Sequence, residues 1–178
     1  MARYEKLYVN EQHVNTLYTG SGEGTEITAT AAEINGACDV SSRVVSIADG
    51  TTYTVLAANS GKLHAIPDLT ATCTISLPTA SAGLDYTFVS KGVAADAQNW
   101  VFDTGSDTNF YLGGITELDT SADTVVLEVP DGDSNSIMTV VTPAPGSTIR
   151  ISCDGTNWIL SGVVQSDTAD AITWADQS

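Results

Sequence analysis

Basic residues are scarce in this 178-residue chain, which has 6 Lys+Arg against 22 Asp+Glu and a formal net charge of −16 at pH 7. Nucleic-acid-binding proteins neutralise phosphates with Lys and Arg, and anionic membrane surfaces attract the same side chains. The charge balance therefore argues against both kinds of partner. No apolar run approaches the roughly 20 residues of a membrane-spanning helix, and the first residues lack the apolar core of a secretory signal. We expect synthesis in the cytoplasm and no contact with a membrane.

Cysteine and histidine are also rare, at 3 and 2 residues. Cys38, Cys73 and Cys153 are too few and too scattered for a disulfide scaffold, and we expect Cys73 and Cys153 as small buried residues in strands. His13 and His64 lie far apart and make no recognisable zinc site. A single strand histidine is usually a surface or edge residue, and we interpret His64 in this way. The sequence predicts no metal centre and no cofactor.

Catalytic motifs are absent as well: the chain has no Gly-x-Ser-x-Gly elbow, and its glycine-rich segment at 20–24 lacks the lysine of a phosphate-binding loop. Glu117 and Asp119 share one face if their segment is extended, and paired carboxylates could serve a glycosidase. We interpret them instead as two solvated carboxylates beside Gly113 and Gly114, and we expect no enzyme.

The segment 131–135 (Asp-Gly-Asp-Ser-Asn) looks like the start of a calcium loop. An EF-hand loop needs Gly at its sixth position and Glu at its twelfth, and Ser136 and Thr142 stand there. A turn between two strands accounts for the segment, although weak Ca²⁺ binding at Asp131 and Asp133 stays open.

Hydrophobic residues make up 42% of the chain, enough for a folded core. From residue 44 onward, short runs of alternating or β-branched residues are separated by Gly, Asp, Asn and Pro, a pattern typical of β-sandwiches and jelly rolls. We predict an all-β fold, with a β-sandwich or jelly-roll-like domain over 44–164. The expected strands are Val44–Ile47, Tyr53–Ala57, Leu63–Ile66, Ala71–Leu77, Tyr86–Ser90, Trp100–Asp103, Val125–Val129, Ile137–Thr142, Thr148–Cys153 and Trp158–Val164.

Three further segments complete the predicted organisation. Residues 27–43 form a short helical connector, because Thr30 and Glu33 match a capping box, and Gly36 is suited to end the helix at about residue 37. Residues 165–178 form an acidic tail in which Trp174 fills a hydrophobic pocket, on its own domain or on a neighbour. Residues 1–26 form an N-terminal arm and a Gly-rich hinge. The arm residues expected to dock on a partner are Arg3, Tyr4, Lys6, Leu7, Tyr8, Val14, Leu17 and Tyr18.

Parts of the chain resemble structural proteins of tailed bacteriophages. Ile27–Asn35 resembles their short helix-forming segments, residues 72–89 resemble the strand–turn–strand of virion-surface β domains, and Asp154–Ser161 is similar to their closing hairpin. Among these proteins, a small chain with an N-terminal arm resembles the head decoration (cement) proteins. That resemblance implies a homotrimer on the outer capsid, bound to the major capsid protein and stabilising the head, with no catalytic motif.

The resemblance leaves three functions open. In a decoration protein of the virion exterior, the arm binds the capsid and the acidic β domain protrudes. A short tail-fibre or receptor-binding protein is the alternative, with Trp100, Phe110 and Tyr111 as candidates for stacking on glycans. A polysaccharide depolymerase is the third, and it needs the Glu117/Asp119 pair.

Overall fold

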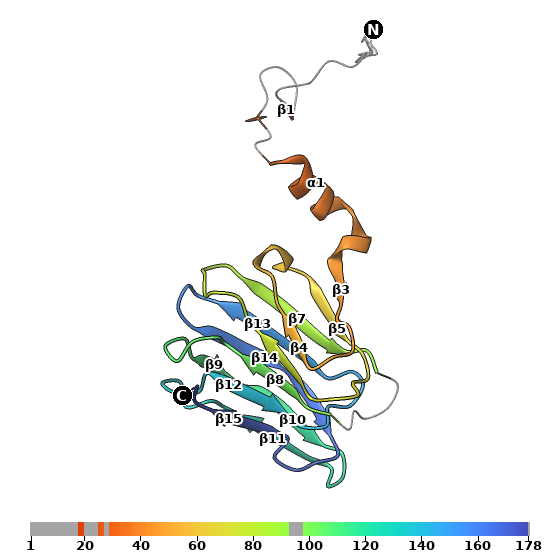
Figure 1. The fold of residues 1–178 in the computed structure, drawn as a ribbon, viewed down its shortest axis with the longest axis vertical. Helices are drawn as coiled ribbons and strands as arrows, with labels where there is room; N and C mark the ends of the chain where they lie inside the picture. The colour runs from red at the N-terminus through yellow and green to blue at the C-terminus, as the bar shows by residue number, and fades with distance from the viewer. Residues whose placement is uncertain (1–17, 20–24, 27–28, 93–97, 178) are drawn as a thin grey trace. The chain divides into compact units, whose positions relative to one another are not determined.

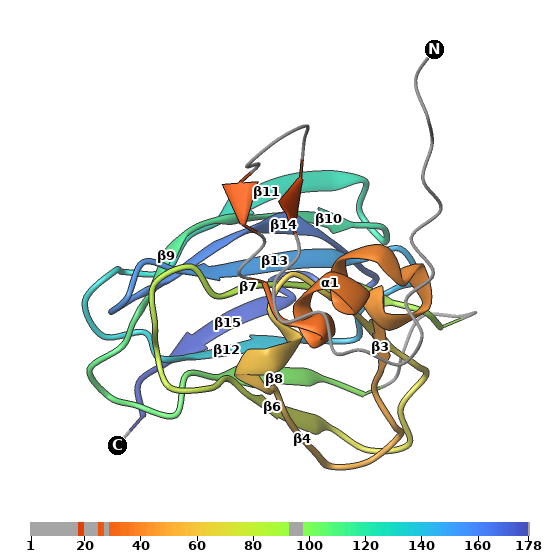
Figure 2. The same ribbon diagram turned by 90° about the horizontal axis from the view of Figure 1, so that it is seen from above.

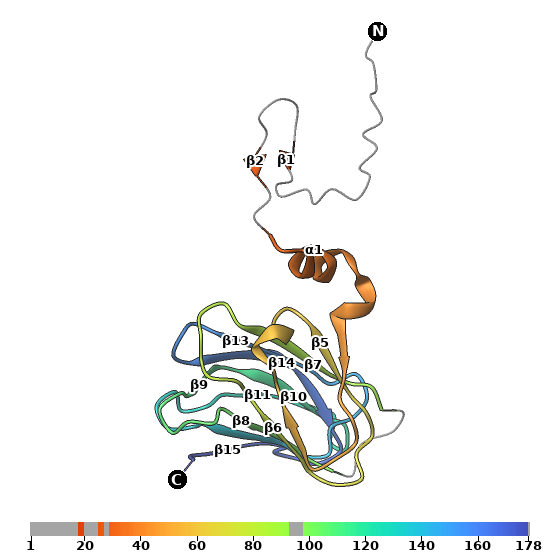
Figure 3. The same cartoon turned by 45° about the horizontal axis from the view of Figure 1, so that its top comes forward.

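The computed structural model describes residues 18–19, 25–26, 29–92 and 98–177, and it divides into two units, Met1–Asp39 and Val40–Ser178. In the first unit, β1 (Tyr18–Thr19) pairs antiparallel with β2 (Thr25–Glu26). Helix α1 (Ala31–Cys38) follows them in the chain (Figure 3). Tyr18 therefore begins a strand. The other predicted arm residues, Arg3, Tyr4, Lys6, Leu7, Tyr8, Val14 and Leu17, lie outside the described residues.

The capping box predicted for α1 is present. The Thr30 hydroxyl accepts a hydrogen bond from the Glu33 N–H, and the Glu33 carboxylate accepts one from the Thr30 N–H. Each partner thus satisfies an orphan donor of the first helical turn. The helix ends at Cys38, close to the expected residue 37, but Gly36 as its cap is wrong: Gly36 lies inside the helix, and the N–H of Asp39 closes the last turn on the carbonyl of Asn35.

The second unit is an all-β sandwich, as predicted, with two short 3₁₀ helices, η1 (Val40–Arg43) and η2 (Ala57–Asn59). Figure 2 shows its two sheets as two layers. The eight-stranded sheet contains β3 (Val44–Ser46), β5 (Leu63–Ile66), β7 (Asp85–Ser90), β9 (Tyr111–Gly113), β10 (Ile115–Asp119), β11 (Thr124–Glu128), β13 (Thr148–Cys153) and β14 (Trp158–Ser166). The five-stranded sheet contains β4 (Thr52–Thr54), β6 (Cys73–Ser76), β8 (Trp100–Asp103), β12 (Ile137–Val140) and β15 (Ile172–Ala175).

The strand order places segments that are distant in sequence side by side. The larger sheet runs β11-β10-β14-β13-β7-β5-β3, with β9 beside β14, and the smaller runs β15-β12-β8-β6-β4. Figure 1 shows β11 and β3 at opposite ends of the larger sheet. Among the described residues, β11 and β3 are the two ends of this strand order, and they and the short β9 are each paired on one side only.

The core forms between the sheets from every second strand residue, since successive strand side chains point to opposite faces. In β7 and β8, for example, Tyr86, Phe88, Trp100 and Phe102 are fully buried, and the residues between them are not. Aromatic side chains remove the most apolar surface from water and dominate such a core. The expected burial of Cys73 and Cys153 is confirmed, and all three cysteines are free thiols.

The predicted acidic tail at 165–178 is wrong as a separate segment. Strand β14 continues to Ser166, and Ile172–Ala175 forms β15, which pairs antiparallel with β12. Trp174 packs against the core of its own domain, with its ring centroid 6.2 Å from that of Tyr111. The sandwich therefore extends past residue 164 because the alternation of Ile172 and Trp174 supplies two more inward side chains.

A bend in the larger sheet is built from glycines. Strand β14 pairs in parallel first with β9 and then with β10. The change of partner falls at Gly113, the last residue of β9, and Gly114, which precedes β10. A Cβ at Gly113 would lie 2.4 Å from the carbonyl oxygen of Leu160, and one at Gly162 would lie 2.2 Å from that of Thr148. At both glycines, the backbone of the neighbouring strand lies closer than a side chain would permit.

Candidate interaction face

The outer face of the eight-stranded sheet carries almost no charge. Its outward strand positions are mainly Val, Leu, Ile, Thr and Ser, and only Asp85 and Arg150 among them are charged. Most acidic side chains of the sandwich lie in turns and loops instead. One row crosses seven strands without a charge, from Leu127 through Thr116, Val163, Thr148, Val89 and Ala65 to Ser46.

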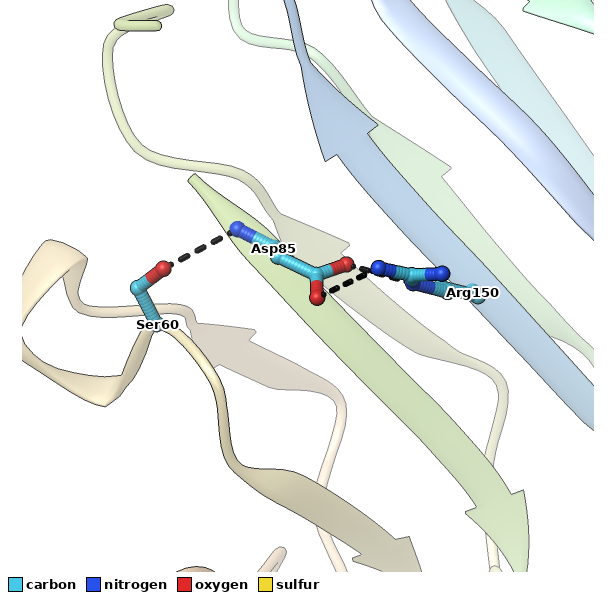
Figure 4. Close-up of polar contacts among 3 residues, drawn as sticks. All are labelled: Ser60, Asp85 and Arg150. Atoms are coloured by element: carbon cyan, nitrogen blue, oxygen red, sulfur yellow. Dashed lines mark hydrogen bonds and ion pairs between the residues drawn. The ribbon is translucent and has the colours of Figure 1, made fainter. Parts of the chain in front are cut away.

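The two charges on this face neutralise each other. Arg150 Nε and Nη2 donate to the two carboxylate oxygens of Asp85 at 2.8 and 2.9 Å, a bidentate pair between β13 and β7 (Figure 4). The Asp85 carboxylate raises the pKa of the Arg150 guanidinium. The N–H of Asp85 also donates to the Ser60 hydroxyl, which ties the start of β7 to Ser60 (Figure 4). The face consequently has no net charge on a chain of −16.

Apolar side chains are exposed where this face reaches the two edges of the sheet. On β11, Val125 and Leu127 are 67% and 64% exposed. On the opposite edge, Val44 of β3 and its cross-strand partner Leu63 of β5 are 48% and 36% exposed. Ile159 and Val163 of β14 lie exposed between the edges. Exposed apolar side chains on an uncharged sheet face are more typical of protein–protein contacts than of small-molecule sites.

The predicted glycan-stacking residues are not on a common surface. Trp100 and Tyr111 are fully buried in the core, and Phe110 is half-buried. Trp100 packs edge-on to Phe102, and Tyr111 packs against Trp174. The sequence shows aromatic residues but not which face of a strand they occupy, and here the inward face takes Trp100 and Tyr111. Their assignment as exposed stacking residues is wrong.

The carboxylates Glu117 and Asp119 do share a face of β10, but they are not solvated as expected. They are only 2% and 5% exposed. Glu117 Oε1 accepts from the N–H of Ala171 at 3.0 Å, and Oε2 accepts from the N–H of Ile172 at 3.2 Å, which fixes the start of β15. Asp119 accepts from the hydroxyl and the N–H of Ser121, and these bonds lower the pKa of its carboxyl. Both carboxylates therefore bind backbone of their own domain.

The segment at 131–135 is a turn closed by its own hydrogen bonds. Asp131 Oδ1 accepts from the N–H groups of Asp133, Ser134 and Asn135, and Oδ2 accepts from the Ser134 hydroxyl. The Ser134 hydroxyl contributes most to lowering the pKa of Asp131, to about 2. Both oxygens that a cation would need already have donors. Within the described ranges, no three His, Cys, Asp or Glu side chains gather as a metal site.

His64 is buried rather than at the surface, which corrects its interpretation as an exposed or edge residue. It is fully buried, and its ring lies 6.0, 5.6 and 5.0 Å from those of Tyr53, Tyr86 and Phe88. Neither ring nitrogen makes a well-aligned hydrogen bond. Burial lowers the pKa of the imidazole, so the neutral form is the one that the core holds.

The burial of His64 predicts a loss of stability in mild acid. Below the unfolded pKa of about 6.5, the His64 imidazole binds a proton in the unfolded chain but not in the folded chain. The free energy of unfolding therefore decreases as the pH is lowered. The loss is limited to about 1.4 kcal/mol per pH unit. We expect the stability of the wild type, measured by urea unfolding between pH 7.5 and 5, to fall relative to that of His64→Phe. Parallel pH profiles of the two proteins would contradict this role for His64.

A shallow surface hollow of about 340 Å³ is lined by Gly105, Ser106, Asp107 and Gln177. It offers one carboxylate and no convergent set of polar groups, unlike the sites that bind small molecules. In the part of the chain that the structure describes, no helix is long and apolar enough to cross a bilayer.

Two comparisons with known proteins found no relative of this chain. No protein-family model matches the chain, and no curated protein matches it closely enough to count as related.

Proposed function

We propose that the chain is a structural protein of a bacteriophage virion, a decoration protein that binds the outer capsid and stabilises the head. The observation that carries the proposal is the uncharged outer face of the eight-stranded sheet, with exposed apolar side chains at both edges. A chain of −16 that concentrates its acids in turns and leaves one broad face neutral has a surface suited to protein contact.

The division of the chain supports the same role. The sandwich has its own core and ends in an ordered edge strand, β15, so it is a stable body that a separate N-terminal segment could attach to a surface. We propose that the arm residues, from Arg3 to Tyr18, contact the major capsid protein. When several copies act together, binding of one arm raises the effective concentration of the others, so many weak contacts suffice to hold the shell.

The copy number of the chain in purified virions tests this function. We expect quantitative mass spectrometry to find the chain in a ratio near one to the major capsid protein, because a decoration protein repeats with the capsid lattice. A few copies to a few tens of copies per particle would assign the chain to the tail. Absence from particles would overturn the virion role altogether.

A further inference from the structure

The backbone is strained at Thr142, two residues after the end of β12. Its φ is +45°, in the left-handed region. Among the described residues, the other non-glycine positions with positive φ are Asp123 and Asp170, and aspartate tolerates this region better than a β-branched residue does. Strain of this kind costs about 1–3 kcal/mol, persists only where the surrounding contacts enforce it, and is concentrated at functional sites. The chain therefore gives up stability to hold Thr142 in this conformation.

The contacts that hold Thr142 in place also surround its hydroxyl with groups that can activate it. Thr142 Oγ1 donates to Asp167 Oδ1 at 3.2 Å. The hydroxyls of Ser166 and Thr168 each lie 2.9 Å from Thr142 Oγ1. A threonine hydroxyl is a weak nucleophile until a neighbouring base takes its proton, and a carboxylate within hydrogen-bond distance is such a base. The Thr142 hydroxyl thus has the partner that a nucleophile needs.

The carbonyl group just before Thr142 is polarised by one of the same hydroxyls. Ser166, fully buried at the end of β14, donates from Oγ to the carbonyl oxygen of Val141 at 3.0 Å. The N–H of Thr168 donates to Ser166 Oγ at 3.1 Å, which leaves the proton of that hydroxyl for the carbonyl. A donor on a carbonyl oxygen stabilises the negative charge that develops there during nucleophilic attack. On the other side of the bond, the N–H of Thr142 donates to Asn99 Oδ1 at 3.4 Å. Side chains therefore hold both ends of the Val141–Thr142 peptide bond.

We propose that the chain cleaves its own Val141–Thr142 peptide bond. The Thr142 hydroxyl is the nucleophile, Asp167 is the base, and Ser166 donates to the carbonyl oxygen under attack. The nucleophile is on the residue that follows the carbonyl, so attack closes a five-membered ring. No substrate has to bind, because the two reacting groups belong to the same chain and the fold holds them together. Each copy reacts once, so the reaction is a maturation step and not a turnover.

The reaction balances with water as its only co-reactant. Attack forms a bond between Thr142 Oγ1 and the carbonyl carbon of Val141, and the hydroxyl proton passes to the Asp167 carboxylate. The C–N bond then breaks, its electron pair stays on the Thr142 nitrogen, and this nitrogen takes the proton from Asp167. The product is an ester between Val141 and the Thr142 hydroxyl. Water hydrolyses the ester to a carboxylate on Val141 and restores the hydroxyl of Thr142, now a new N-terminus.

Cleavage relieves the strain at Thr142. The torsion φ is defined by the carbonyl carbon of the preceding residue, and after cleavage that carbon is no longer bonded to the Thr142 nitrogen. Residues 142–178 nevertheless stay bound to the rest of the sandwich, because β13 pairs with β7 and β15 pairs with β12. The product is a nicked sandwich that keeps both of its sheets.

Mass spectrometry of the purified full chain, incubated at neutral pH and 37 °C, tests the proposal. We expect the pieces 1–141 and 142–178 to accumulate over days, with masses that sum to the intact mass plus one water. The rate is expected to be first-order and independent of protein concentration, because the reaction is intramolecular. Hydroxylamine attacks esters far faster than peptide bonds, so it is expected to accelerate the cleavage and to leave a hydroxamate on Val141.

Variants assign the roles. Thr142→Gly removes the hydroxyl and suits the positive φ, so it is expected to fold and to stay intact, whereas Thr142→Ser keeps a nucleophile and is expected to cleave. Asp167→Asn, at an exposed position, is expected to slow cleavage by about 10²–10⁴-fold. Ser166→Ala is expected to slow it by about 10²–10³-fold. Thr173→Val, at an exposed position on β15, is the matched control and is expected to cleave at the wild-type rate.

Thermal unfolding verifies that each variant is folded. A wild type that stays intact over a week, or a cut at another bond, would overturn the proposal. A Thr142→Gly protein cut at the same bond would also overturn it, because a contaminating protease would then be responsible. Cleavage of Asp167→Asn at the wild-type rate would overturn the role of Asp167 as the base. These outcomes are independent of the proposed function, since they need only the purified chain.

Discussion

Replacing Gly113 by alanine is expected to lower the free energy of unfolding by about 3 kcal/mol. Two effects act together at this position. The backbone has a φ of +89°, which L side chains adopt only with strain. The added Cβ would lie 2.4 Å from the carbonyl oxygen of Leu160 and 3.3 Å from its carbonyl carbon. Backbone atoms of a central strand cannot move aside as a flexible side chain can, so β14 must shift.

Two other glycines separate these effects. Gly61 has a φ of +81° but nothing within 4 Å of an added Cβ, and Gly50 has neither constraint. We expect Gly61→Ala to cost about 1 kcal/mol from backbone strain alone and Gly50→Ala to have almost no effect. Chemical denaturation of the three variants measures the series. If Gly113→Ala were no less stable than Gly61→Ala, the close approach of the two strands would not limit this position.

The glycine bend also explains what the sequence could not reveal. Alternation of apolar and polar residues correctly predicted a β-sandwich, because a half-buried strand has this period in any partner arrangement. The pair Gly113–Gly114 looks like a turn in sequence, so β9 and β10 on either side of it were not expected as strands. Their pairing with β14, some 47 residues further along, is non-local, and residue pattern carries no information on it.

The same limit applies to the candidate sites. Periodicity placed Glu117 and Asp119 on one face of a strand, and this is confirmed. Periodicity does not say whether that face is inside or outside, and both carboxylates proved to be buried. The interaction face was missed for a related reason. Its neutrality appears only when seven strands are placed side by side, although the lack of charge in each run of Val, Leu, Thr and Ser is visible in the sequence.

Removing the buried carboxylate of Glu117 is expected to cost about 2–5 kcal/mol in the Glu117→Ala variant. Its two oxygens are the acceptors for the N–H groups of Ala171 and Ile172, both of which are buried. A buried N–H left without a partner costs about 1–3 kcal/mol, and the variant leaves two. Strand β15, with Trp174 and the last backbone pairs to β12, loses its anchor at its first residue. Unfolding in urea measures the loss.

Glu117→Gln refines this test because it keeps the size of the side chain. Its amide oxygen accepts from one N–H, but its amide nitrogen is a donor that faces the other N–H. We expect a cost between those of the wild type and Glu117→Ala, whereas Thr116→Ala, at the neighbouring outward position, is expected to change stability only slightly. A Glu117→Gln protein as stable as the wild type would mean that the two hydrogen bonds to β15 do not hold the strand. The carboxylate would then be unexplained by the fold, and a chemical role for the Glu117/Asp119 pair would be the next hypothesis to test.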